Sequence, residues 1–81
     1  MAIARDELIR ILAEADPAGL VARGAARDEY ADEVDAILSL QGVPQLTEIT
    51  NVFAVSFSEP GVCTRDTARW IAEQMVARSS R

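Results

Sequence analysis

The stretch that decides the fold is residues 16–30, which read DPAGLVARGAARDEY. Asp16 followed by Pro17 is a typical helix start, because the carboxylate caps backbone N–H groups and proline suits the first helical position. Gly24 suits the left-handed residue just past a helix end, and Asp28 is the next candidate cap. The stretch therefore predicts a short helical turn, from Pro17 to Arg23, between two longer helices.

Apolar residues recur at helical spacing on both sides of this turn. Residues 4–15 carry an apolar stripe at i, i+4, i+7 and i+8, and residues 28–42 continue the same period as far as Gly42. Thr64 is a further candidate cap, and a last helix is expected to follow it.

Residues 46–58 fit two patterns. A helical stripe runs through Ile49, Phe53 and Phe57, while Phe53, Val55 and Phe57 also alternate as in a strand. A single strand would have no partner for its backbone groups, so we expect a helix. Because this segment is apolar around much of its circumference, we expect it to be the central and most buried element.

These patterns predict an all-α protein. Its 81 residues suit one domain, residues 1–81, with four helices and a short helical turn between the first and second. The residues expected in its core are Leu8, Ile11, Leu12, Leu20, Val34, Ile37, Leu38, Ile49, Phe53, Phe57, Ile71 and Met75.

The charge balance limits the kinds of partner that we expect. Thirteen acids face eight bases, all arginine, for a net charge of −5. This balance disfavours nucleic acids and anionic lipid surfaces, whose binding needs positive charge, and it is compatible with a basic protein partner. The N-terminal sequence is typical of neither a signal peptide nor a membrane span.

The composition also limits the catalytic groups, metal ligands and disulfides that the chain can supply. The chain has no histidine, which is the commonest general base and zinc ligand, and its single Cys63 cannot form an internal disulfide. A lone cysteine suits a reducing compartment. We therefore expect a cytoplasmic protein without a metal or another cofactor.

An acidic block without a base begins at Asp28. Its members are Asp28, Glu29, Asp32, Glu33 and Asp35. The block is either a contact surface for a basic partner, a loose divalent-metal site, or a solvated helix start near the positive end of the helix dipole. Because it lacks the glycine-containing oxygen-ligand loop of calcium sites, a partner surface is the favoured functional interpretation.

Three other residues invite a functional interpretation. Trp70 falls almost opposite the apolar stripe of the last helix, so it is either an exposed binding hot spot or is covered by the first helix or the N-terminus. Cys63 lies near a helix start, where a thiolate is favoured, but is more typical of a small buried residue. Tyr30 has no evident base beside it, so we expect its ring to pack and its hydroxyl to reach water or a carbonyl.

Parts of the chain resemble a family of small helical bacterial proteins of unknown function, the DUF1871 type. The resemblance rests on the Asp16-Pro17-x-Gly19-Leu20 start, on Asp28-Glu29-Tyr30 with the spaced Val34, Ile37 and Leu38, and on Val52-Phe53 with Phe57. The last helix lies outside it. Small domains of this kind are sometimes similar to immunity proteins, which neutralise bacterial toxins, and the family pattern implies no catalytic residues.

We therefore expect a non-catalytic, cytoplasmic protein-binding module. It would act like an immunity protein, masking a basic toxin surface with the acidic block. The alternative is a structural or regulatory subunit that self-associates through Trp70, as a homodimer. An enzyme that uses Tyr30 or Cys63 is the third hypothesis, and we do not expect it.

Overall fold

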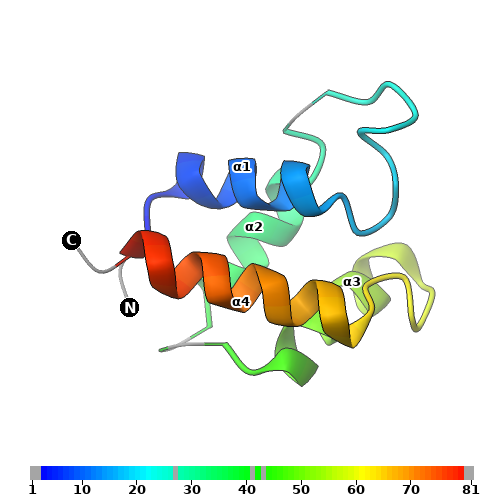
Figure 1. Cartoon of the computed structure of the whole chain (residues 1–81). Coiled ribbons are helices and arrows are strands. Elements are labelled where there is room, and N and C mark those ends of the chain that lie inside the picture. The colour runs from blue at the N-terminus through cyan, green and yellow to red at the C-terminus, as the bar shows by residue number, and fades with distance from the viewer. Residues whose placement is uncertain (1–2, 27, 41, 43, 80–81) are drawn as a thin grey trace.

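The computed structural model describes residues 3–26, 28–40, 42 and 44–79. Over these residues it contains four helices and no strand: α1 (Arg5–Ala15), α2 (Ala31–Leu38), α3 (Leu46–Phe57) and α4 (Arg65–Ser79) (Figure 1). The predictions of an all-α fold and of a helix over residues 46–58 are confirmed. None of the helices in the described part of the chain is long and apolar enough to cross a membrane.

The four helices pack in a closed ring. Figure 1 shows α1 and α4 side by side and antiparallel, with α2 and α3 behind them. Each helix packs against two neighbours, in the order α1–α2–α3–α4–α1. The expectation that α3 is central is therefore wrong. Only Ile49 and Phe53 of α3 are buried, whereas Val55 is 70% exposed, because one flank of this largely apolar helix faces solvent.

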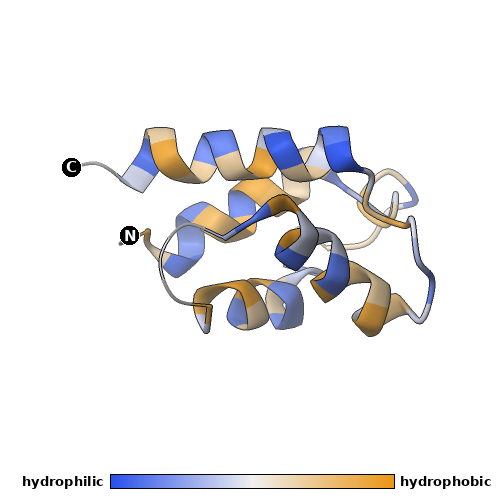
Figure 2. Ribbon diagram, turned by 90° about the horizontal axis from the view of Figure 1, so that it is seen from below, coloured by the Kyte–Doolittle hydropathy of each residue, from blue (hydrophilic) through white to orange (hydrophobic). Residues whose placement is uncertain are grey.

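One core joins all four helices. Hydrophobic and hydrophilic residues alternate along the helices (Figure 2), as expected when each buries one stripe. The buried cluster consists of Leu8, Ile11, Leu12, Tyr30, Val34, Ile37, Ile49, Phe53, Cys63, Ala68, Ile71 and Met75. Of the other expected core residues, Leu20 and Phe57 are only partly buried. Leu38 is 38% exposed, because it ends α2 beside the face that buries Val34 and Ile37.

Asp16 ends α1 instead of starting a helix. It adopts a left-handed backbone conformation (φ 45°), and its N–H donates to the Leu12 carbonyl at 2.8 Å. Its carboxylate accepts the backbone N–H groups of Val21 and Ala22, each at 3.0 Å. The predicted helical turn is present as hydrogen-bonded turns that finish at Gly24 (φ 98°), while the predicted cap role of Asp16 is wrong.

Tyr30 holds the same loop from the core side. Its hydroxyl donates to Asp16 Oδ1 at 2.6 Å and accepts the N–H groups of Ala18 and Leu20 at 3.1 and 3.4 Å. The hydroxyl therefore reaches a carboxylate, not the water or carbonyl that we expected. Burial, reinforced by the hydrogen bond to Asp16, raises the pKa of Tyr30 from 10.0 to about 12. Asp16 and Tyr30 together form a clamp on the loop between α1 and α2, which we call the loop clamp.

The loop clamp predicts a pH dependence of stability with a defined sign. Because folding raises the pKa of Tyr30 from 10.0 to about 12, its contribution is complete below pH 10 and is lost as the pH rises to about 12. Burial alone would raise the pKa of Asp16, but hydrogen bonds from Tyr30 and from backbone N–H groups outweigh it and lower the pKa. The Asp16 contribution is therefore lost as the pH falls below about 3.8.

Urea unfolding across the pH scale checks this expectation. Burial also raises the pKa of Cys63 from 9.0 to about 11, so wild-type protein loses stability at alkaline pH through both groups. In Tyr30→Phe only the Cys63 part should remain, giving a smaller alkaline loss. An equal alkaline loss in both proteins would contradict the clamp.

α2 begins later than expected. The Asp28 carbonyl accepts the Ala31 N–H at 3.0 Å, so residues 28–30 form a turn, and the cap position of α2 is Tyr30. Asp28 is therefore not the helix cap, and both Asp28 and Glu29 lie exposed ahead of the helix. The helix ends at Leu38: Ser39 is its C-cap and Leu40 forms a bend, so the predicted continuation is wrong for these two residues, and Gln41 lies outside the described residues.

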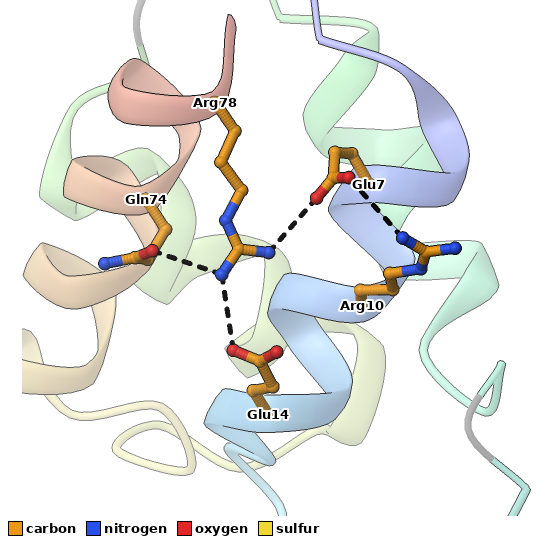
Figure 3. A network of polar contacts seen from close by, with 5 residues as sticks. All are labelled: Glu7, Arg10, Glu14, Gln74 and Arg78. Carbon is orange, nitrogen blue, oxygen red and sulfur yellow. Dashed lines mark hydrogen bonds and ion pairs between the residues drawn. The ribbon is translucent and has the colours of Figure 1, made fainter.

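An arginine joins the two ends of the chain. Arg78 of α4 donates to Glu7 and Glu14 of α1, at 3.1 and 3.4 Å, and to Gln74 at 3.2 Å (Figure 3). Arg10 approaches the same Glu7 at 3.7 Å. Because only about a quarter of the Arg78 side chain is exposed (27%), this network fixes the α1–α4 pair more firmly than an exposed ion pair would.

Candidate functional site

Asp35, one of the five acids of the block, forms an ion pair with another residue of the same chain. Arg5 of α1 reaches it with a fork of two hydrogen bonds, Nε to Oδ1 at 2.8 Å and Nη2 to Oδ2 at 3.3 Å. The hydrogen bond from Arg5 has the largest effect and lowers the pKa of Asp35; burial opposes it, and the charge of Arg5 lowers the pKa further. Asp35 therefore connects α2 to α1 through an ion pair. We had expected it to be an unpaired charge available to a partner, and it is paired with Arg5 instead.

Glu33 is a buried member of the block. Only 4% of the residue is exposed, and its Oε2 accepts a hydrogen bond from Ser56 Oγ of α3 at 2.8 Å. The expectation of a solvated surface acid is wrong for this residue. The sequence did carry a signal, because Tyr30, Glu33, Val34 and Ile37 follow the spacing i, i+3, i+4 and i+7 of one helix face. Glu33 thus occupies a core-facing position of α2.

Glu33 lies at the side of a hollow between α2 and α3, which we call the α2–α3 groove. The groove has a volume of about 380 Å³ and is open to solvent. It is lined by Asp32, Glu33, Ala36, Asn51, Val52, Val55 and Ser56. Asp32 is exposed, Val52 is half-buried, and Val55 is 70% exposed. The groove therefore combines carboxylates with an apolar flank.

The two oxygens of Glu33 differ in their hydrogen bonds among the described residues. Ser56 occupies Oε2, and no hydrogen bond to Oε1 is formed within the described part of the chain. Every fully buried side-chain nitrogen or oxygen among those residues has a hydrogen-bond partner. Glu33 therefore brings a carboxylate that is 4% exposed to the lining of the groove.

The groove lies in the acidic half of the chain. Residues 28–64, which include α2 and α3, contain seven acids and no base, whereas the rest of the chain carries six acids and eight arginines. Asp28 and Glu29 extend the negative charge beyond the start of α2, where both are exposed. This asymmetry gives the α2–α3 side an excess of negative charge.

Trp70 lies in a different place. It is half-buried and packs against the core, so it is not the exposed indole of the hot-spot interpretation. It also lines a second hollow of about 280 Å³, together with Glu14 and Ala15 of α1 and with Asp66 and Thr67. This Trp70 hollow shares no lining residue with the α2–α3 groove. The six candidate residues thus do not form a single site.

The candidate nucleophiles are poorly placed for catalysis. Cys63 is buried, and burial raises its pKa to about 11, which leaves it as a thiol at neutral pH. The Tyr30 hydroxyl is held in the loop clamp. Among the described residues no three acidic, cysteine or histidine side chains gather as metal ligands would. The chemistry that the site residues do offer is recognition of a cation beside an apolar surface.

Comparison with known proteins gives no match: no family model, no curated protein and no solved structure matches this chain. The resemblance to the DUF1871 type stays a prediction.

Proposed function

We propose that this protein is a non-catalytic protein-binding module whose α2–α3 groove binds a basic partner protein. The observation that carries the proposal is the groove itself, where exposed Asp32 and buried Glu33 face an apolar flank formed by Val52 and Val55. Protein interfaces place apolar anchors at their centre and complementary charge around them. A groove of this composition suits a partner segment that carries both basic and apolar side chains.

The charge distribution supports a basic partner in particular. The segment that forms the groove carries no base, and the exposed Asp28, Glu29 and Asp32 lie on one stretch of chain beside it. Opposite charge accelerates encounter and selects against acidic partners. We place the module in the cytoplasm because its single cysteine is a free thiol.

Neutralisation of a toxin, as by an immunity protein, is the role that we propose for this binding. Blocking a toxin needs only complementary charge and a few buried anchors, without a catalytic group. The state of Cys63 and Tyr30 supports a non-catalytic role, because one is a buried thiol with a raised pKa and the other is held by Asp16.

The test is capture of partners from a host extract by the immobilised protein, followed by binding with the purified partner. Wild-type protein should retain a basic partner at low salt and lose it at high salt. Asp32→Lys should weaken this binding, whereas Glu73→Lys, an equal charge change at an exposed position of α4, should not. Glu33→Lys is unsuitable, because a buried lysine would disturb the fold.

Two outcomes would contradict the proposal. Equal loss of binding in Asp32→Lys and Glu73→Lys would show that only net charge matters. Recovery of the protein itself as the sole bound species, with a mass that falls in Trp70→Ala, would favour the self-associating subunit instead.

A further inference from the structure

We propose that the α2–α3 groove is a receptor for a single arginine side chain, with the guanidinium at Glu33 and Asp32 and the hydrocarbon stem against Val52 and Val55. This inference rests on the proposed function and specifies the chemistry of the partner. It names one side chain, whereas the proposed function requires only a basic partner.

The burial of Glu33 favours a cationic ligand in the groove. A charged side chain that is 96% removed from solvent is costly unless it is paired and hydrogen-bonded. Here Oε2 has a neutral hydroxyl donor, Ser56, and no hydrogen bond to Oε1 is formed among the described residues, while Glu33 lines the groove. A cation that enters the groove supplies a charged partner for this carboxylate.

The groove also offers more than one hydrogen-bond acceptor. Asp32 and Glu33 are consecutive residues of α2 that both line the groove, and Asn51 adds an amide from α3. A guanidinium presents five N–H donors in a rigid plane, so it can bond to more than one of these acceptors at once. A lysine ammonium is a compact, strongly hydrated point charge and loses more on entering a partly apolar hollow.

The apolar flank of the groove suits the hydrocarbon stem of an arginine. Val52 is half-buried, and Val55 is the most exposed of the large apolar residues in the described chain. An arginine covers such a surface with its methylene groups while its head reaches a carboxylate. The groove, at about 380 Å³, lies within the range of small-ligand sites. None of the chain's own described arginines lines it.

The test uses three capped amino acids as probes: the N-acetyl amides of arginine, lysine and citrulline, the last being a neutral shape match for arginine. Each is titrated into 15N-labelled protein, and the shifts of the backbone amides are followed. We expect saturable shifts of α2 and α3 residues with arginine, weaker ones with lysine, and about tenfold weaker binding or none with citrulline.

Matched variants identify the carboxylate. Glu33→Gln keeps the shape of the side chain and should weaken arginine binding about tenfold, while Glu73→Gln on α4 should leave it unchanged. Asp32→Asn, at an exposed position, provides a second test if Glu33→Gln fails to fold, and should also weaken binding. Ser56→Ala, which leaves the charge of Glu33 in place, should retain arginine binding.

The inference fails if citrulline binds as well as arginine, if Glu33→Gln or Asp32→Asn binds arginine unchanged, or if the shifts centre on Trp70. Its failure is distinct from failure of the proposed function. A partner that still discriminates Asp32→Lys from Glu73→Lys would preserve the binding module, even if the groove took no arginine.

Discussion

Replacing Tyr30 with alanine is expected to lower the free energy of unfolding by about 3–5 kcal/mol. Tyr30 is 1% exposed, and its ring packs edge-on against Phe53 and Phe57 at centroid distances of 5.9 and 6.3 Å. The substitution opens a cavity among α2 and α3 and also removes the hydroxyl that holds the loop. Because a domain of this size is stabilised by about 5–15 kcal/mol in all, the loss is a large fraction of its stability.

Tyr30→Phe separates the two contributions. It keeps the ring and removes only the hydroxyl, so Asp16 loses a donor and the N–H groups of Ala18 and Leu20 lose an acceptor. We expect a loss of about 1–3 kcal/mol, measured by urea unfolding. A Tyr30→Phe protein as stable as wild type would show that the Tyr30 hydroxyl contributes nothing to the loop clamp.

Reversing two exposed charges is expected to slow association with the partner at least about tenfold at low salt. Glu29 and Asp32 lie on the exposed side of the acidic half, so Glu29→Lys with Asp32→Lys removes the attractive field without emptying a buried site. The salt dependence of the association rate should flatten as well, because less charge remains to be screened. Stopped-flow or surface-based kinetics with the purified partner measures both effects.

The control for this change reverses two acids that are also exposed but lie elsewhere on the molecule. Asp66→Lys with Glu73→Lys alters net charge by the same amount on α4. We expect a much smaller effect on the rate. Equal slowing by both pairs would mean that the partner responds to net charge alone, and the acidic half would then have no special role.

The helices were predictable because their apolar residues recur at the spacing of one helix face, which is the face that becomes buried. Leu8, Ile11 and Leu12 of α1 are buried as expected, as are Ile71 and Met75 of α4. The helical choice for residues 46–58 followed from the lack of a partner strand. The position of α3 in the ring was not predictable in this way. Hydrophobicity gives the width of an apolar face, but only packing decides which part of it, such as Val55, is left exposed.

The polar interactions were less predictable because they join distant parts of the chain. The sequence places Asp16 before a proline, as in a helix cap, and cannot show that Tyr30 lies 2.6 Å from its carboxylate. Glu33 could have been found from its spacing with Val34 and Ile37, but its surrounding acids made it resemble a solvated residue. Ser56, its partner from α3, carries no comparable local signal.

The candidate site was predicted in part. The acidic block does mark the side of the molecule on which the α2–α3 groove lies, through Asp32 and Glu33. Its other members divide between exposed residues ahead of α2 and an ion pair with Arg5. Trp70 belongs to a separate hollow, since α4 packs against α1 and α3 and not against α2. Linear proximity and residue type could not reveal this separation.

The most direct measurement of the central claim is the footprint of the captured partner on 15N-labelled protein. Backbone amides that broaden or shift in the complex identify the contact surface. The account predicts that they cluster at residues 29–36 and 51–56, on the two sides of the α2–α3 groove. A footprint centred on Trp70, Asp66 and Thr67, with residues 29–36 and 51–56 unperturbed, would contradict it.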